Sequence, residues 1–311
     1  MEASPKCNLI IDSCCDLPYD MVNRPGVQLL EFPYIDEEGE HSDDFYQSIT
    51  AHDFYEKMRG GSKPSTAQVP ITKFQEMFSA VIESGVPTVY LSFTSGLSGS
   101  YNTAVMVRDQ LIAENPDAEL YVVDTCLASV AEALLVYEAI SQRDNGMSAR
   151  ELAEWAAEAR YFIDAEFMVD DLEALRRGGR IPNSVAYAGS KLDVKPLLSI
   201  TIEGKLSLVG VARGRKKGIK QLVEYASKRM SDKMPGRHVV IGNADCPKDA
   251  SRLKELLQKE DEHLLFLESS IGPVIGSHVG PGMVAVVFWG GDKREDLSVA
   301  DRIARKIKKE D

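Results

Sequence analysis

The chain has 311 residues, 44% of them hydrophobic and 27% charged, and its formal net charge is -12. This length suffices for about two domains with cores of their own, and the acidic balance argues against nucleic acid as the main partner, because phosphate neutralisation requires a basic surface. No apolar run approaches the roughly 20 residues that span a bilayer, and the N-terminus lacks the pattern of a secretory signal. We therefore expect a cytoplasmic protein that is not an integral membrane protein.

The five cysteines have no paired metal-ligand spacing, and two of them, Cys14 and Cys15, are adjacent. In a cytoplasmic protein they are expected to be reduced thiols. The sequence also lacks the signatures of nucleotide, dinucleotide and zinc-protease sites. We therefore predict neither a metal site nor a cofactor.

Strands and helices alternate through the first half of the chain. The apolar runs typical of buried strands are residues 7–11, 27–35, 88–93 and 119–124. Helical patterns cover residues 54–59, 73–84, 102–114, 127–143 and 149–160. Asp16 is an expected helix N-cap, and residues 36–44 are expected to form an acidic loop. The alternation predicts a three-layer α/β/α domain with a parallel sheet over residues 1–162.

The pattern changes in the second half, residues 163–311. Strand-like runs at residues 194–202 and 205–211 flank Glu203 and Gly204, which is a hairpin signal and implies antiparallel pairing. Further strands and helices follow, and the basic run at residues 302–309 is most simply a solvated helix face. We predict a two-layer α/β domain with a mixed sheet. Its last two strands flank residues 271–282, which are expected to form a glycine-rich loop.

A hydroxyl-rich joint connects the strand at residues 88–93 to the following helix, and it reads TSGLSGS over residues 94–100. Glycines let the backbone approach a ligand, and the amides that open a helix carry partial positive charge. The joint lies at the carboxyl end of a parallel strand, where ligands bind in such sheets. It is therefore suited to a carboxylate or phosphate. The alternative is an ordinary capped turn in which Ser95 or Ser98 is an N-cap.

Two other loops contain candidate ligand groups. Thr66 lies in a second loop rich in small and hydroxyl residues; taken alone, this loop is more simply a linker punctuated by prolines. His278 is flanked by glycines and has few neighbours to satisfy its ring locally, although a single His is more often structural than functional.

Taken in order, the motifs resemble those of the DegV family. The matching stretches are residues 12–13 (DS), 66–68 (TAQ), 95–101 (SGLSGSY), 170–172 (DDL), 177–181 (RGGRI), 195–197 (KPL) and 276–282 (GSHVGPG). The chain departs from the family's usual TSQP pattern at Ala67 and Val69. The resemblance covers nearly the whole chain and implies a bacterial cytosolic protein with two α/β domains and a long-chain fatty acid, such as palmitate, buried between them. It also implies that related members present the fatty acid to a fatty acid kinase.

The resemblance further implies which residues bind the fatty acid. The family's carboxylate-binding Thr and Ser map to Thr66 and Ser98, the loop His maps to His278, and Ser95 is a neighbouring candidate. The acyl chain is implied to run into the second domain. Burying about fifteen methylenes at ~0.8 kcal/mol each gives on the order of 12 kcal/mol before association costs, so the tail supplies affinity and the polar groups satisfy the carboxylate.

We therefore predict a fatty-acid-binding protein that is not an enzyme. The alternative from another class is a serine hydrolase, in which Ser98, His278 and an acid such as Asp124 form a triad. The G-x-S-x-G signature of a nucleophile elbow is absent, which disfavours this alternative. A third reading is an interaction module with an empty cleft.

Two local basic clusters stand out on the acidic chain, at residues 176–180 and 213–217. Neighbouring glycines leave Arg180 and Arg213 few bulky residues to pack against, which suggests exposed heads. We predict that both arginines dock a protein partner, such as a fatty acid kinase subunit, and do not hold the fatty acid. The alternative is that they are solvated loop arginines or local salt-bridge partners.

Overall fold

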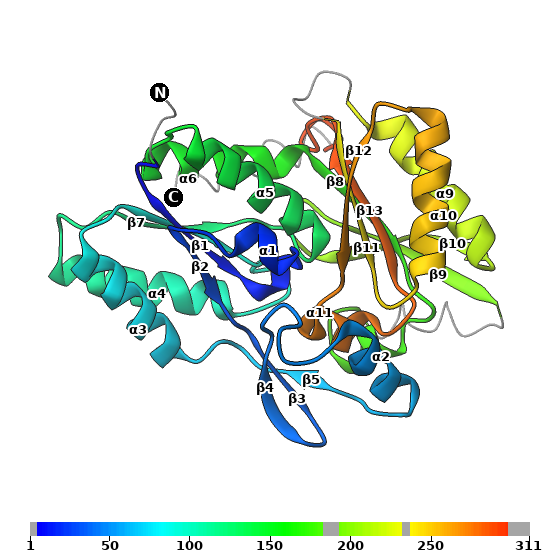
Figure 1. Cartoon of the computed structure of the whole chain (residues 1–311), viewed down its shortest axis with the longest axis horizontal. Helices are drawn as coiled ribbons and strands as arrows, with labels where there is room; N and C mark the ends of the chain where they lie inside the picture. Colours follow the sequence, from blue (N-terminus) through cyan, green and yellow to red (C-terminus); the bar gives the residue numbers. More distant parts are fainter. Residues whose placement is uncertain (1–4, 183–192, 232–236, 298–311) are drawn as a thin grey trace.

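The computed structural model describes residues 5–182, 193–231 and 237–297, so the basic run at residues 302–309 lies outside the described residues. The described chain forms a four-stranded sheet (sheet A), a six-stranded sheet (sheet C) and a small three-stranded sheet (sheet B) (Figure 1). Within these residues, no helix has the length and apolar character needed to cross a bilayer.

Sheet A is entirely parallel, as predicted. Its strand order is β2 (Val27–Leu30), β1 (Asn8–Asp12), β6 (Thr88–Ser92) and β7 (Leu120–Asp124). All five residues of β6 are buried, as expected for a strand covered on both faces. The covering helices are α3 (Ile71–Ser84) and α4 (Ser100–Glu114) on one face, and α5 (Val130–Asp144) and α6 (Ala149–Ala159) on the other (Figure 1).

Two sequence predictions are wrong for the part of the chain that forms sheet B. The apolar run at residues 27–35 is two strands in different sheets, because the chain leaves sheet A after β2 and enters β3 (Pro33–Asp36). The expected acidic loop contains β4 (Gly39–Ser42), which pairs with β3 in a hairpin. On its other side, β3 pairs with β5 (Ser65–Thr66), and this pairing places Thr66 opposite Tyr34.

The turn after β1 also differs from its prediction. Asp16 is not a helix N-cap. It ends the short 3-10 turn η1 (Ser13–Cys15) with a φ of 51° and is almost completely buried. The next helix, α1 (Tyr19–Val22), is instead preceded by Pro18.

Sheet C is mixed, which confirms the prediction for the second half. Its order is β10 (Leu206–Arg213), β9 (Val194–Ile200), β8 (Ile163–Met168), β13 (Val284–Trp289), β11 (His238–Asn243) and β12 (Leu265–Ser270). The predicted hairpin is confirmed as the antiparallel pair of β9 and β10, and only β11 and β12 are parallel.

Helices cover both faces of sheet C. One face packs against α9 (Arg215–Arg229) and α10 (Pro247–Glu260), and the other packs against α5, which belongs to the first half of the chain. Figure 1 shows α5 between the two large sheets. One hydrophobic core therefore extends from sheet A through α5 to the inner face of sheet C.

The sequence predicts a glycine-rich loop at residues 271–282, and this prediction is wrong. It contains helix α11 (Pro273–Val279), which packs against α7 (Glu173–Arg177), α2 (Ala51–Arg59) and β5. Pro273 at the first helical position and Gly280 with a φ of 74° are a helix start and a helix stop. The last turn of this helix carries His278.

Candidate functional site

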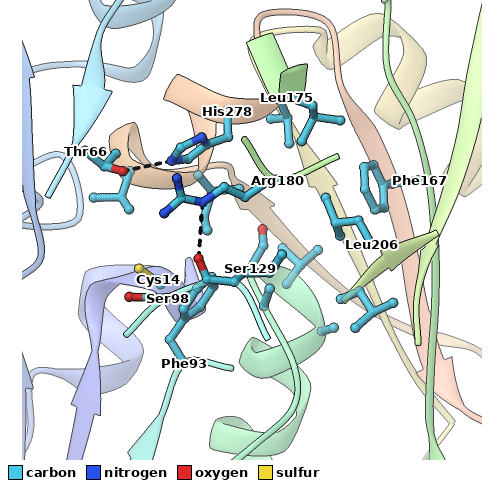
Figure 2. Close-up of a pocket in the computed structure, with 18 of the residues that line it drawn as sticks. Cys14, Thr66, Phe93, Ser98, Ser129, Phe167, Leu175, Arg180, Leu206 and His278 are labelled. Atoms are coloured by element: carbon cyan, nitrogen blue, oxygen red, sulfur yellow. Dashed lines mark hydrogen bonds between the residues drawn. The ribbon is translucent and has the colours of Figure 1, made fainter. Parts of the chain in front are cut away.

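An apolar cavity of about 290 Å³ lies where the start of α5, the inner face of sheet C and α11 meet (Figure 2). The side chains that make most of its wall are apolar: Phe32, Phe93, Leu97, Ala165, Phe167, Leu175, Ile200, Leu206, Val274, Ile275, Val279, Met283, Ala285 and Val287. In the register of sheet C, Ala285 lies directly opposite Phe167. Most of the cavity can therefore hold only a hydrocarbon group.

Polar side chains gather at one end of this cavity. Thr66 comes from β5, Ser98 from the joint before α4, His278 from α11 and Arg180 from the segment after α7. The Oγ1 atom of Thr66 and the Nε2 atom of His278 are 2.8 Å apart. Figure 2 shows Arg180 between this pair and Ser98, whereas Phe167 and Leu206 lie away from them. The cavity thus has a polar end and an apolar body.

His278 is a neutral hydrogen-bonding group at this site. Burial, together with the charges of Arg180 and Arg177, lowers its pKa from 6.5 to about 4. Its Nδ1 atom is buried and has no hydrogen-bond partner among the described residues. A Cβ atom placed on Gly178 would lie only 2.1 Å from that nitrogen, so the glycine is what lets the ring fit.

We expect Gly178→Ala to weaken ligand binding about tenfold, because the added methyl group would push His278 away from Thr66 and remove one hydrogen bond. Gly178 has a φ of -73°, which alanine adopts without strain. Titration of a palmitate probe measures the effect. Gly210→Ala is the matched control, because its Cβ would make only ordinary contact with Leu197, and equal affinities of the two variants would contradict the prediction.

Arg180 is half-buried and lines the cavity, so the expectation of an exposed head is wrong for this residue. Its Nε atom donates to the Leu97 carbonyl at 3.2 Å, and a second nitrogen donates to the Gly178 carbonyl. Among the described residues, no carboxylate pairs with it, and burial lowers its pKa. A half-buried guanidinium without a counter-ion favours an anion at this end of the cavity.

The two serines of the joint behave differently. Ser98 lines the cavity, and its hydroxyl donates to Ser100 at 3.1 Å. The Ser100 hydroxyl accepts the Val69 N–H at 3.2 Å, which ties the Thr66 loop to the joint. Ser95 does not line the cavity, because its hydroxyl donates to Asp124 at 2.5 Å. The structure therefore brings Ser98 to the candidate site and leaves Ser95 outside it.

The hydrolase triad is not formed. A serine hydrolase needs one hydrogen bond from Ser to His and a second from His to an acid. Here the His278 Nε2 atom bonds to Thr66, the Ser98 hydroxyl bonds to Ser100, and Asp124 accepts from Ser95 and from the Cys126 amide. The hydrolase alternative is therefore unsupported.

Arg213 lies away from the cavity lining, exposed at the end of β10. It is therefore accessible, as the sequence suggested.

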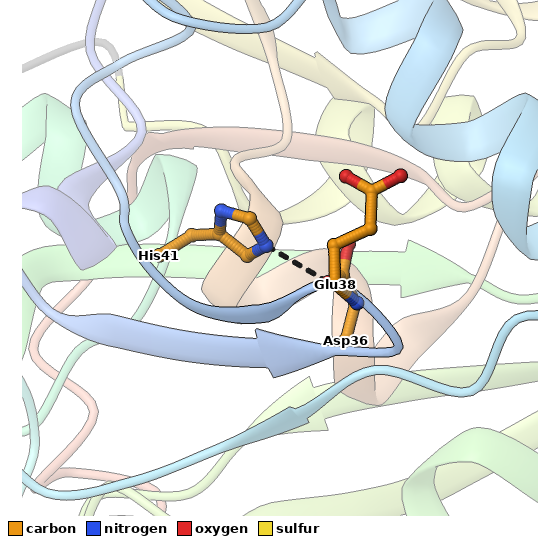
Figure 3. Close-up of side chains that lie close together, drawn as sticks. All are labelled: Asp36, Glu38 and His41. Atoms are coloured by element: carbon orange, nitrogen blue, oxygen red, sulfur yellow. Dashed lines mark hydrogen bonds and ion pairs between the residues drawn. The ribbon is translucent and has the colours of Figure 1, made fainter.

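A separate polar group lies on the hairpin of β3 and β4, where Asp36, Glu38 and His41 come together (Figure 3). The His41 Nε2 and Asp36 Oδ1 atoms are 2.8 Å apart. The Lys57 ammonium lies 2.9 Å from Glu38 and 3.8 Å from Asp36, so the chain itself supplies positive charge to both carboxylates. We interpret this group as an ion-pair network that fixes the hairpin to α2.

Several carboxyl groups are buried in the interior of the protein. Burial raises the pKa of Asp12 and Asp43 to about 7, and burial together with Asp164 does the same for Glu166. Glu132 is fully buried, and both of its carboxyl oxygens lack hydrogen-bond partners in the described part of the chain. Burial raises its pKa well above the usual range. These groups hold protons at a pH where they would be ionised in the unfolded chain.

Stability of the ligand-free protein is therefore expected to fall as the pH rises from about 4 to about 7. The raised pKa values of Asp12, Asp43 and Glu166 contribute stability at low pH that is lost from about pH 4 to about pH 7. The lowered pKa of His278 acts in the opposite direction, but one imidazole does not offset three carboxyls. Thermal unfolding across this range tests the sign. Glu166→Gln removes one of the three carboxyl groups, so the melting temperature of this variant should depend less on pH. A wild-type melting temperature that rises with pH over this range would refute the prediction.

The chain matches known proteins over nearly its whole length. The family model described as "Uncharacterised protein, DegV family" matches residues 6–290. A DegV domain-containing protein of Clostridium perfringens is 36% identical over 286 residues, which are 92% of this chain and 98% of the relative.

Solved structures give the same match. One is a protein of Thermotoga maritima whose structure is described as revealing a fatty acid binding function, with 28% identity, a TM-score of 0.76 and coverage of 92% of this chain and 99% of the other. A second is a fatty acid binding DegV family protein of Streptococcus agalactiae, with 26% identity, a TM-score of 0.79 and coverage of 93% and 100%.

Proposed function

Because this chain belongs to the DegV family, we propose that its cavity binds one long-chain fatty acid such as palmitate. The observation that carries the proposal is an apolar cavity with, at one end, a half-buried guanidinium that pairs with no carboxylate among the described residues. In this arrangement the carboxylate contacts Arg180, Thr66, Ser98 and His278, and the acyl chain extends along the inner face of sheet C. The ligand then lies between residues 1–162 and residues 163–311.

The apolar wall and the polar end of the cavity contribute differently to the free energy of binding. Each buried methylene contributes ~0.8 kcal/mol, so the apolar wall supplies most of the affinity. A buried carboxylate without partners would be costly, and Arg180 with three neutral hydrogen-bonding groups removes that cost. Two features support binding without catalysis: the triad is not formed, and related proteins are described as fatty acid binding.

We further propose that the protein carries the fatty acid in the cytoplasm and presents it to a partner such as a fatty acid kinase. The exposed Arg213 supports a docking surface for an acidic partner. Arg180 sits in the cavity wall and is assigned to the ligand in this proposal. The proposed function requires no cofactor.

The experiment is to purify the protein from a bacterial host, denature it and identify the released lipid by mass spectrometry. We expect about one long-chain fatty acid per chain. Delipidated protein should then bind added palmitate and bind hexadecanol, which lacks the carboxylate, more weakly. If extraction recovers no fatty acid and neither compound binds, the proposal is wrong.

A further inference from the structure

One buried carboxyl group joins the starts of two helices that border the polar end of the cavity. Asp16 is 1% exposed, and its backbone has a left-handed φ of 51°. One carboxyl oxygen accepts the Ser129 hydroxyl at 2.5 Å, and the other accepts the Gly272 N–H at 2.9 Å. Ser129 precedes α5, and Gly272 precedes α11, so Asp16 connects elements that are far apart in the sequence.

Both partners of Asp16 lead directly into the candidate site. Ser129 lines the cavity, and Figure 2 shows it on the side opposite His278. Its φ of 55° is unusual for a non-glycine residue, so the surrounding contacts must hold it there. The Cys14 carbonyl, which accepts the Ser129 amide at 2.8 Å, is another such contact. Gly272 starts the seven-residue helix that carries His278 in its last turn.

The start of α11 is fixed by a second buried carboxyl group. Asp43 accepts the Val274 N–H at 3.4 Å, while Tyr55 donates to the Ile271 carbonyl at 2.8 Å. A Cβ atom on Gly272 would lie 2.6 Å from Asp16 and 2.9 Å from Asp43, so both carboxyl groups press against this glycine. A short helix held this tightly at its start has little freedom to tilt, and a tilt would displace His278 from Thr66.

We propose that Asp16 is a positioning residue for the carboxylate site: its two hydrogen bonds hold the start of α5 and the start of α11 at the spacing that places His278 against Thr66. Asp16 does not line the cavity, so it acts through Ser129 and Gly272. This inference rests on the proposed fatty acid function. It adds that recognition of the head group, and not only folding, depends on this one side chain.

The test measures the ratio of the affinities for palmitate and hexadecanol, because a loss of stability alone leaves this ratio unchanged. Asp16→Ala removes both hydrogen bonds, and we expect the ratio to fall about tenfold. Asp16→Asn should keep most of the ratio, because the amide oxygen can accept from Gly272 and the amide nitrogen can donate to the Ser129 hydroxyl. Leu253→Ala, in the core on the far side of sheet C, is the control that destabilises without changing the ratio.

Failure of the positioning role of Asp16 can be distinguished from failure of the proposed fatty acid function. If wild-type protein binds neither compound, the proposed function fails first. If wild-type protein prefers palmitate and Asp16→Ala keeps that preference, the positioning role is wrong. If Asp16→Ala does not fold, Ser129→Ala removes one of the two hydrogen bonds, and an unchanged ratio in that variant overturns the inference. An equal loss in Asp16→Asn and Asp16→Ala would also overturn it.

Discussion

Ala285→Phe should abolish high-affinity palmitate binding while leaving the protein folded. Ala285 is 2% exposed and lies on β13 opposite Phe167, in the apolar body of the cavity. A phenyl ring at this position would displace about four methylenes of the acyl chain. At ~0.8 kcal/mol for each methylene, the loss is about 3 kcal/mol, or roughly a hundredfold in affinity. The added ring fills empty space, so the melting temperature should not fall.

Chain-length dependence makes this prediction specific. A short fatty acid such as octanoate should lose much less affinity than palmitate, because its tail does not reach as far along the cavity. Val209→Phe is the matched control, since it adds the same side chain at a 51% exposed position on β10. Isothermal titration with both acids measures the effect. Wild-type palmitate affinity in folded Ala285→Phe would place the acyl chain elsewhere.

The second large effect is expected for Arg180→Ala. A hydrogen bond to a charged group is worth ~1.5–3 kcal/mol, so loss of this guanidinium should weaken palmitate binding roughly 10- to 100-fold. Hexadecanol binding should change little, because the alcohol carries no charge for Arg180 to neutralise. Direct titration of delipidated protein with the two compounds measures both values.

Arg213→Ala is the control, because this arginine is exposed and outside the cavity lining. Its palmitate affinity should equal that of the wild type. Unchanged palmitate binding in Arg180→Ala would instead support the sequence-based interpretation, in which both arginines serve a partner.

Most of the fold could be predicted because its signals are local. The buried run of β6 and the hairpin signal at Glu203 and Gly204 depend on neighbouring residues, and both predictions are confirmed. The errors arose where tertiary context decides. The run at residues 27–35 is continuous in the sequence, yet its two parts pair with different sheets. Glycine content suggested a loop at residues 271–282, although Pro273 and Gly280 are the start and stop signals of α11.

Only part of the candidate site could be predicted from the sequence, because some of its contacts join residues that are far apart in the chain. Family resemblance pointed to Thr66, Ser98 and His278, and the structure places all three on one cavity. The glycines beside Arg180 suggest exposure and therefore a partner-docking role, whereas its position depends on the Leu97 carbonyl, 83 residues away in the sequence. The roles of Asp16 and Ser129 likewise depend on a contact across 113 residues. No local pattern contains such information.

The position of α5 between the two large sheets has a consequence for how the protein folds. Its buried residues lie all around the helix, as expected for a helix enclosed by protein on every side. One side of α5 completes the covering of sheet A, and the other covers sheet C, although the helix ends before the second half of the chain begins. Separating the halves would expose that second side to water. We therefore expect the two halves to unfold as one cooperative unit, because the apolar cavity exists only when both have folded against the same helix.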